Sequence, residues 1–524
     1  MLSPLNERTK LMKRLSALVL VLSLLLSMTG CSSGSTQPPV QPQQTTPPVQ
    51  SPSTPAPSKP NSELPERLEN LDAPLTLAED QAQAFLNWLG MQTVEYEFYG
   101  LLQPEQAMQT YREIIPYSST ECGLIRNGTL DQDGLRSRVL DNNKNYLAAY
   151  TGNKFSELSG PDFDKIFGSV CQGVEYLLET GCDAARMDEK LSDLKIFSSS
   201  ENGAARMTHQ ETILAINLAV IEASQKNAPE IDYLKQVALH ETMHLGQLCS
   251  DTERTAEGYE VNIGPCYGWE NEQPRTMFWN WYIEGSAEWL AMDACQSSQP
   301  AAYAPYIKAL ESLAVTLIPA QESDAVVMQS LDPDLDRFFA LFGAETDEER
   351  AEIVHMLWAV ELALTQSSEF YQAYKAQRGS FEENKMYYHR ELLASAGQTL
   401  TKVFYRQLCS LAQDGSSLQE LFSLITVFET EMNRLVGYNN TWSEVEPFKA
   451  QYTAIQSAFF EQLAATSGMT VDEVEGQFLA WYYSEASAAL YAPGSTSEQQ
   501  VWLQELMDDR AAFNMKKKAV CDLF

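Results

Sequence analysis

The sequence predicts a mainly α-helical protein that carries a small β-sheet, an α+β fold. Several helix starts have a hydroxyl residue followed three positions later by a glutamate, a pair that satisfies the first free amides of a helix. These pairs are Thr76…Glu79, Thr346…Glu349, Ser380…Glu383 and Thr470…Glu473. Apolar residues then recur at helical spacing, as at Ile353, Leu357, Val360 and Leu364. Strand patterns are few by comparison.

The best strand pattern is the β-branched, apolar run "TILAINLAVIEA", Thr212 to Ala223. Apolar runs of this kind occur both in buried strands and in buried helices, and periodicity alone does not separate the two. Both readings remain open for this segment.

Length and charge limit the possible organisation and partners. A chain of 524 residues is too long for one compact core, so we expect two or three domains. The formal net charge is −35, from 36 Lys and Arg against 71 Asp and Glu. Such a chain repels phosphate backbones, so we expect no nucleic-acid partner.

Residues 1–30 have the pattern of an export signal. Basic residues precede Leu15 to Ser27, an uncharged apolar run that is too short to span a bilayer comfortably. The run leads into "MTGC", and small residues before Cys31 resemble a bacterial lipobox. That resemblance implies that Cys31 carries a lipid and becomes the mature N-terminus. The alternative is an ordinary cleaved signal peptide.

Residues 31–62 are rich in Pro, Ser, Thr and Gln and contain almost no large apolar side chains. They cannot bury enough surface to offset their ordering entropy, and proline keeps them extended. We predict a tether between a lipid anchor and the folded body. Together with the signal, it predicts a protein at the bacterial cell surface or the extracytoplasmic face of the membrane.

The segment "HETMH" places His240 and His244 four positions apart. On a helix, both imidazoles then lie on one face, at a separation that suits two ligands of one zinc ion. Glu241 is rotated from His240 by about 100° and can lie beside the metal without binding it. The alternative is a core helix with two packed histidines.

A second segment, "WYIEGSAEWLA", begins at Trp281 and places Glu284 forty residues after His244. With HETMH it resembles the gluzincins, zinc metallopeptidases that combine HExxH with a glutamate on a downstream helix. The resemblance implies that Glu284 is the third zinc ligand and that Glu288, one turn later, orients a ligand histidine. We attribute the small residues Gly285 and Ala287 to a close approach between this helix and the HExxH helix.

The resemblance also implies a mechanism and a layout. One Zn²⁺ per chain would activate a water, with Glu241 as general base. A tyrosine or histidine from the C-terminal half usually assists the transition state. The candidates are Tyr387, Tyr388, His389 and, less favoured because its neighbours are apolar, His355. We expect a helical N-terminal region at 63–205 and a zincin-like catalytic core at 206–300. A helical C-terminal region at 301–524 would complete the cleft or bind partners.

The leading hypothesis is a membrane-anchored zinc metallopeptidase that hydrolyses peptide or protein substrates outside the membrane. One alternative is a catalytically silent lipoprotein that binds ligands or builds surface structure on a peptidase-like scaffold. Another is a zinc hydrolase of a non-peptide cell-wall bond. Endopeptidase and exopeptidase action both remain open.

The segment between the two motifs carries two further expectations. Cys249 and Cys266 are the favoured pair for a disulfide, although sequence cannot establish the pairing. The aromatic residues in and beside it either line the substrate cleft or pack against the body; they are Tyr267, Trp269, Trp279 and Trp281.

Overall fold

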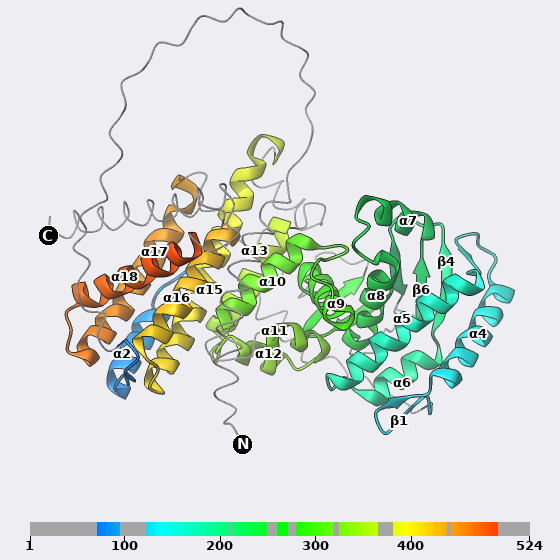
Figure 1. The fold of residues 1–524 in the computed structure, drawn as a ribbon, viewed down its shortest axis with the longest axis horizontal. Helices are drawn as coiled ribbons and strands as arrows, with labels where there is room; N and C mark the ends of the chain where they lie inside the picture. The colour runs from blue at the N-terminus through cyan, green and yellow to red at the C-terminus, as the bar shows by residue number, and fades with distance from the viewer. Residues whose placement is uncertain are drawn as a thin grey trace, which may run out of the picture. The chain divides into compact units, whose positions relative to one another are not determined.

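The computed structural model describes residues 71–94, 122–208, 211–248, 259–270, 279–317, 324–364, 381–436 and 442–490. Helices dominate these ranges, which confirms the predicted mainly α fold with a small sheet (Figure 1). The predicted signal peptide (1–30) and tether (31–62), with Cys31, lie outside them. The domain boundaries at 205/206 and 300/301 stay predictions.

The helices of the described ranges lie mostly in the second half of the chain. They are α2 (Glu79–Gly90), α4 (Gln132–Ala149), α5 (Gly160–Glu179), α6 (Ala184–Ser192), α7 (Leu218–Asn227), α8 (Tyr233–Gln247), α9 (Asn280–Cys295), α10 (Ala304–Leu317), α11 (Ala325–Met328), η1 (Gln329–Leu331), α12 (Leu335–Leu341), α13 (Asp347–Leu364), α15 (Phe381–Gln413), α16 (Leu418–Val436), α17 (Trp442–Ser467) and α18 (Val471–Leu490). Within these ranges, no helix combines the length and the apolar character that crossing a membrane requires.

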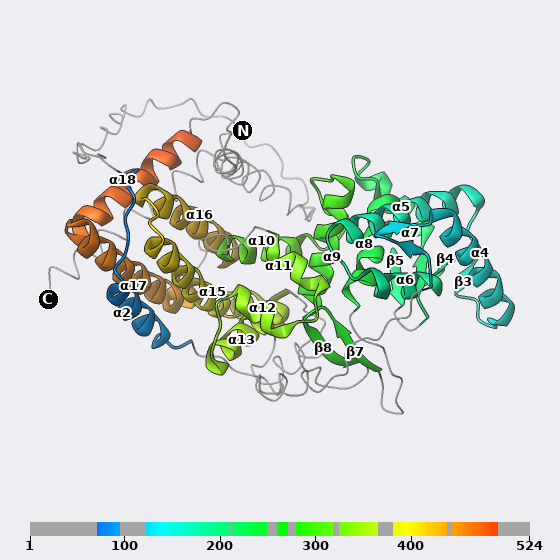
Figure 2. The same cartoon turned by 90° about the horizontal axis from the view of Figure 1, so that it is seen from below.

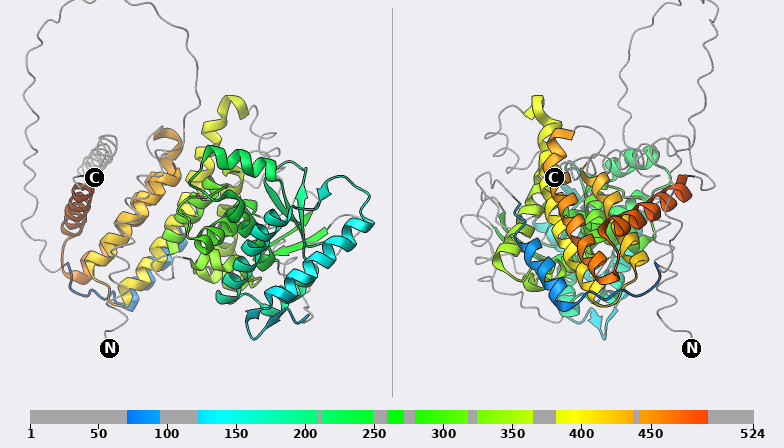
Figure 3. Two further views of the ribbon diagram at one scale, coloured as in Figure 1. Left: turned by 45° about the vertical axis from the view of Figure 1, so that its right-hand side comes forward. Right: turned by 90° about the vertical axis from the view of Figure 1, so that its left-hand side faces the viewer.

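The strands form one four-stranded sheet and two hairpins. They are β1 (Ile125–Arg126), β2 (Thr129–Leu130), β3 (Phe155–Ser156), β4 (Lys195–Ser199), β5 (Ala205–Thr208), β6 (Ile213–Ile216), β7 (Tyr259–Ile263) and β8 (Cys266–Glu270). The sheet has the order β3-β4-β6-β5, with β4 and β6 parallel and the other pairs antiparallel. Helix α4 packs against β4 (Figure 3), and β7 and β8 form one of the hairpins (Figure 2).

The segment Thr212–Ala223 contains both of the structures that its sequence allows. Its first part is strand β6, which is buried along its whole length. Asn217 then accepts a hydrogen bond from the backbone N–H of Val220 and begins α7. Asparagine is a favoured residue at a helix start, so the change from strand to helix falls where the side chain can cap.

The described residues group into two compact units. The smaller one contains 71–75, 417–427 and 463–490; in it, the backbone N–H of Gln419 donates to the carbonyl of Leu71, and Phe422 packs on Phe478. The larger unit contains the described residues of 76–416 and 428–462, and with them the sheet and both predicted zinc-binding segments.

Helix α8, which carries HETMH, is buried because other helices pack on it from more than one side. It packs against α5 and against α9, as Figure 1 shows, and β5 also lies against it. A Cβ atom at Gly173 of α5 would lie 2.9 Å from Thr242 Cγ2, so only glycine allows this approach. The start of α8 is fixed by Asp232, which accepts a hydrogen bond from the N–H of Lys235.

Helix α9, which carries Glu284, has no side-chain cap from its own N-terminal segment. Instead, the buried carboxylate of Glu361 on α13 accepts a hydrogen bond from the N–H of Trp281 at 3.0 Å. The indole of Trp281 donates to the carbonyl of Leu357, and the hydroxyl of Tyr282 donates to the carbonyl of Val326. These bonds hold the first turn of α9 just before the predicted ligand.

Two of the predicted helix starts are confirmed. Thr346 and Thr470 each accept a hydrogen bond from a glutamate N–H three residues on, and each glutamate accepts one from the threonine N–H. Ser380 lies outside the described residues. The start predicted at Thr76 is wrong: the N–H of Leu77 donates to Ala412 in an extended segment, and α2 begins only at Glu79.

We predict that Glu361→Ala lowers the free energy of unfolding by about 1–3 kcal/mol, because a buried amide at the start of α9 loses its acceptor. Glu361→Gln keeps a carbonyl oxygen and should cost about 1 kcal/mol or less, chiefly the attraction between a carboxylate and the helix N-terminus. Urea unfolding followed by circular dichroism gives both values. Equal stability of wild type and Glu361→Ala would show that this carboxylate does not anchor α9.

Candidate metal centre

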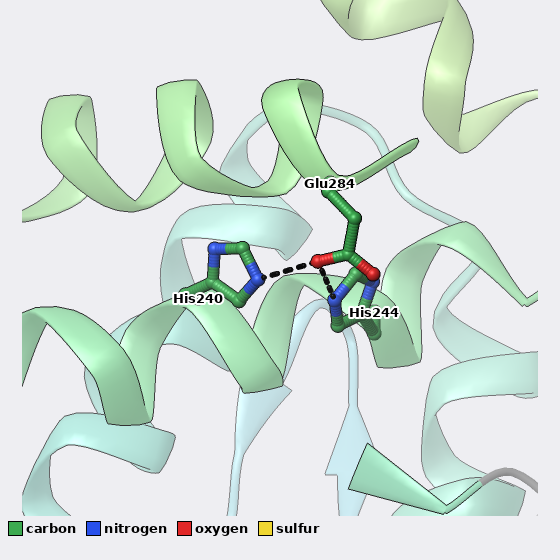
Figure 4. Close-up of side chains that lie close together, drawn as sticks. All are labelled: His240, His244 and Glu284. Atoms are coloured by element: carbon green, nitrogen blue, oxygen red, sulfur yellow. Dashed lines mark hydrogen bonds and ion pairs between the residues drawn. The ribbon is translucent and has the colours of Figure 1, made fainter. Parts of the chain in front are cut away.

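His240, His244 and Glu284 come together between α8 and α9. Their metal-binding atoms all lie within 4.8 Å of one another. One carboxylate oxygen of Glu284 lies 3.2 Å from His240 Nε2 and 3.6 Å from His244 Nε2 (Figure 4). Atoms that share a tetrahedral zinc at bond lengths near 2.0–2.1 Å are about 3.3 Å apart, so these separations fit a zinc ligand set.

The outer nitrogen of His240 is held by Glu288. His240 Nδ1–H donates to Glu288 Oε2 at 2.9 Å, and both side chains are buried. This contact fixes the tautomer and directs Nε2 toward Glu284. It is the arrangement that the resemblance predicted for Glu288. The other oxygen of Glu288 accepts a bond from Gln236 Nε2 at 2.8 Å.

The outer nitrogen of His244 is held by Gln247, a contact that sequence reasoning missed. His244 Nδ1–H donates to Gln247 Oε1 at 2.7 Å. The Gln247 amide in turn donates to the carbonyl of Ile283 and to Ser330 Oγ. Gln247 thus orients one ligand of α8 and also binds α9 one residue before Glu284. Its position three residues after His244 is the only sequence signal, and many helical glutamines share it.

The site attracts positive charge. Burial lowers the pKa of His240, but the carboxylates of Glu284 and Glu288 outweigh it and raise that pKa to about 10. The pKa of His244 is also raised, because Glu284 outweighs burial. Burial raises the pKa of Glu284, but the two imidazoles hold it well below its usual range. Two imidazole nitrogens beside a carboxylate fit a zinc ion in both charge and chemistry. The other nitrogen of each imidazole is held by a hydrogen bond, as in known zinc sites.

Glu241 lies beside the ligands without being one of them. Its carboxylate is buried, and burial raises its pKa despite the two neighbouring imidazoles. Strand β5 packs against α8 here, and the backbone of Met207 in β5 acts in the opposite direction, lowering the pKa of Glu241. A carboxyl group of raised pKa next to a metal centre holds an accepted proton more readily than an ordinary carboxylate does.

A cavity of about 420 Å³ opens at this cluster. Glu241, His244 and Glu284 line it, together with β5 and the segment that precedes β5. Tyr303 lines it as well and was not a sequence candidate. The ring of Tyr303 stacks on that of His240, with centroids 5.3 Å apart, and burial together with the nearby charge of Glu284 raises the pKa of its hydroxyl.

Of the predicted transition-state donors, the structure describes the side chain of His355 alone. Tyr388 and His389 fall in the first turns of α15, but their side chains lie outside the described residues. His355 on α13 is not among the residues that line the cavity, and burial lowers its pKa to about 4. That environment agrees with the preferred interpretation of His355 as a packed histidine.

One structural reason given for the second motif is wrong. Gly285 does not provide room for α8: a Cβ atom there would lie 2.9 Å from Leu310 Cδ1 and 3.1 Å from Tyr306 Cβ, both on α10. The residue after Glu284 is rotated by about 100° around the helix and therefore faces a different neighbour. Gly285 is needed for the packing of α10 onto the back of α9.

The structure tests some of the expectations for the segment between the two motifs. Trp279 and Trp281 are almost fully buried, so they pack the body and do not line the cavity. The side chains of Tyr267 and Trp269 lie outside the described ones, as does Cys249, so its predicted bridge to Cys266 stays a prediction.

Comparison of the chain with protein-family models gives no match. Comparisons with curated proteins and with solved structures also give no significant match. The class of protein must therefore be argued from the residues of the site and their geometry.

We predict that Gln247→Leu lowers zinc affinity by about 10- to 100-fold, because His244 loses the acceptor that orients it. Gln83→Leu, at an exposed position of α2, is the matched control. Competition with a chromophoric chelator measures the affinity, and circular dichroism verifies that each variant is folded. Unchanged zinc affinity in folded Gln247→Leu would contradict this role.

Proposed function

We propose that the protein is a zinc-dependent peptidase that acts on peptide or protein substrates outside the membrane. The observation that carries this proposal is the cluster of His240, His244 and Glu284, which opens through His244 and Glu284 onto a cavity that Glu241 also lines. The two imidazoles and the Glu284 carboxylate would hold the zinc, one ion per chain. The zincin-like nature of the core is part of the same proposal.

When bound, zinc acts as a Lewis acid that lowers the pKa of water and polarises a carbonyl group. Glu241 would take a proton from the attacking water and pass it to the departing amine. Its raised pKa suits both steps, because the group must accept a proton and then release it. Glu288 and Gln247 keep the two imidazoles in the tautomer whose Nε2 carries the lone pair that would bind the metal.

The position of strand β5 favours a peptide as the substrate. It is at an edge of the four-stranded sheet among the described strands, and it borders the cavity. The bond from Asn217 N to Ala204 O marks these two residues as a hydrogen-bonded pair. Pairs alternate along an antiparallel ladder, so the backbone groups of Ala205 and Met207 point to the free edge.

An extended peptide can add to such an edge as a further strand. Met207 of β5 and Glu241 line the same cavity, so a strand paired with β5 would pass beside the proposed base. This observation favours a substrate with backbone amides over the non-peptide cell-wall bond considered above. It leaves endopeptidase and exopeptidase action equally possible.

The lipid anchor at Cys31 and the location at the extracytoplasmic face of the membrane are proposed from the sequence of residues 1–62. An acidic body, a tether and a lipid are compatible with a peptidase that works close to the membrane surface. No nucleic-acid partner is proposed, because the net charge of −35 opposes it.

Glu241→Gln should retain about one zinc per chain and lose peptide turnover by roughly 10²- to 10⁴-fold, because the general base is removed and the ligands remain. His244→Ala and Glu284→Ala should instead lose the zinc. Glu222→Gln, an exposed glutamate of α7, controls for the change of charge. Metal content by mass spectrometry and cleavage of a peptide library are the measurements.

Three outcomes would overturn parts of this proposal. A wild-type protein that binds no zinc would remove the metal centre. Full activity in Glu241→Gln would remove its assigned role. Zinc binding without cleavage of any library peptide would favour the catalytically silent lipoprotein.

Cys31→Ser in the full chain should move the protein from the membrane fraction to the soluble fraction, because the lipid attachment site is lost. Cys122→Ser, at an exposed cysteine of the body, is the matched control. Fractionation of cells and immunoblotting measure the distribution. Membrane association that persists in Cys31→Ser would contradict a lipid anchor at this cysteine.

A further inference from the structure

Tyr303 has a backbone conformation that is rare for a large side chain. Its φ is 57°, in the left-handed region, where residues with a Cβ are uncommon and bulky ones more so. Its carbonyl accepts hydrogen bonds from the N–H groups of Tyr306 and Ile307 in the first turn of α10. Glycine or asparagine would meet both demands with less strain, so the backbone alone does not explain a tyrosine here.

The ring of Tyr303 is held by two stacked neighbours. It stacks on His240, with an interplanar angle of 18°, and on Tyr306, with centroids 5.2 Å apart and an angle of 19°. It nevertheless remains 37% exposed, and it lines the cavity with Glu241 and Glu284. A rigid phenol therefore faces the space that a substrate would enter.

The backbone just before Tyr303 is fastened by Glu288. Glu288 Oε1 accepts hydrogen bonds from the N–H of Ala301 at 2.6 Å and of Ala302 at 3.3 Å. Its second oxygen holds the ligand His240. The same carboxylate thus sets the direction of a metal ligand and the position of the residue stacked on that ligand.

We propose that Tyr303 is a catalytic residue of this site, whose hydroxyl donates a hydrogen bond to an oxygen of the substrate bound at the metal centre. Glu288 is its positioning residue, acting through the amides of Ala301 and Ala302. The inference rests on the proposed function. It assigns to Tyr303 the donor role for which the sequence offered Tyr388 and His389.

Acetohydroxamate, a small metal-binding anion, tests the donor without any need for turnover. Cobalt(II) replaces zinc, and acetohydroxamate binding is followed through the visible spectrum of the metal. Tyr303→Phe keeps the stacked ring and removes only the hydroxyl. It should weaken acetohydroxamate binding by about 10- to 100-fold and change cobalt affinity by no more than about threefold. Tyr306→Phe, the adjacent ring of the stack, should leave both affinities near those of wild type.

Ala301→Pro tests the positioning role, because proline removes the N–H that Glu288 accepts and leaves Glu288 and His240 unchanged. It should weaken acetohydroxamate binding in the wild-type background and have no further effect in Tyr303→Phe, since both changes act through one hydroxyl. Circular dichroism establishes that each variant is folded. Additive effects of the two changes would refute the positioning role of Glu288.

In peptide cleavage, Tyr303→Phe should lower kcat and leave KM nearly unchanged, because the bond forms mainly in the transition state. Equal acetohydroxamate affinity in Tyr303→Phe and wild type would overturn the proposal for Tyr303. Wild-type protein that binds cobalt and acetohydroxamate but cleaves no peptide would overturn the peptidase function alone. Absence of cobalt binding would overturn both.

Discussion

The candidate metal centre depends on the contact between α8 and α9, because neither helix carries a complete ligand set. Helix α8 contributes two imidazoles and α9 contributes the carboxylate between them. The separation of the three groups is therefore determined by residues that bind no metal. Gly173 lets α5 press on α8 from behind, and Glu361 holds the first turn of α9. Gln247 then connects the two helices at the level of the ligands.

The two imidazoles are held by different chemistry. Behind His240 there is a carboxylate, Glu288, and behind His244 there is an amide, Gln247. A carboxylate makes its imidazole more basic and stabilises positive charge on it, whereas an amide only orients the ring. One oxygen of the Glu288 carboxylate accepts from His240, and the second accepts from the backbone of the loop that carries Tyr303. An amide in place of Glu288 has a donating NH2 group at one of the two oxygen positions, so it could not accept from His240 at one position and from that loop at the other.

The parts of this site that sequence predicts are those set by helical geometry. The i, i+4 spacing of His240 and His244 and the one-turn spacing of Glu284 and Glu288 place their side chains correctly, because a helix fixes direction over one turn. The same geometry, applied to Gly285, would have shown that it lies on a different face of α9 from Glu284. The division of Thr212–Ala223 at Asn217 was likewise accessible, since asparagine caps helices.

The remaining parts depend on tertiary structure. Gln247 reaches Ser330 across 83 positions of sequence, and Tyr303 belongs to no pattern that marks a functional residue. Thr76 has the right residue three positions later, but a tertiary bond from Leu77 to Ala412 keeps the chain extended there. Local signals predict an element only where no distant partner offers the backbone a better bond.

The buried carboxylates of this site require a positive charge among them. Three carboxylates, those of Glu241, Glu284 and Glu288, are gathered around two buried imidazoles in a chain that is already strongly acidic. Burial opposes such a concentration of negative charge, so the site is stable only with positive charge among the carboxylates. Protons on the imidazoles can supply it, which is why the pKa values of both histidines are raised. A divalent cation supplies it at the same place and leaves the imidazoles neutral, as ligands must be, so protons and metal compete for one cluster.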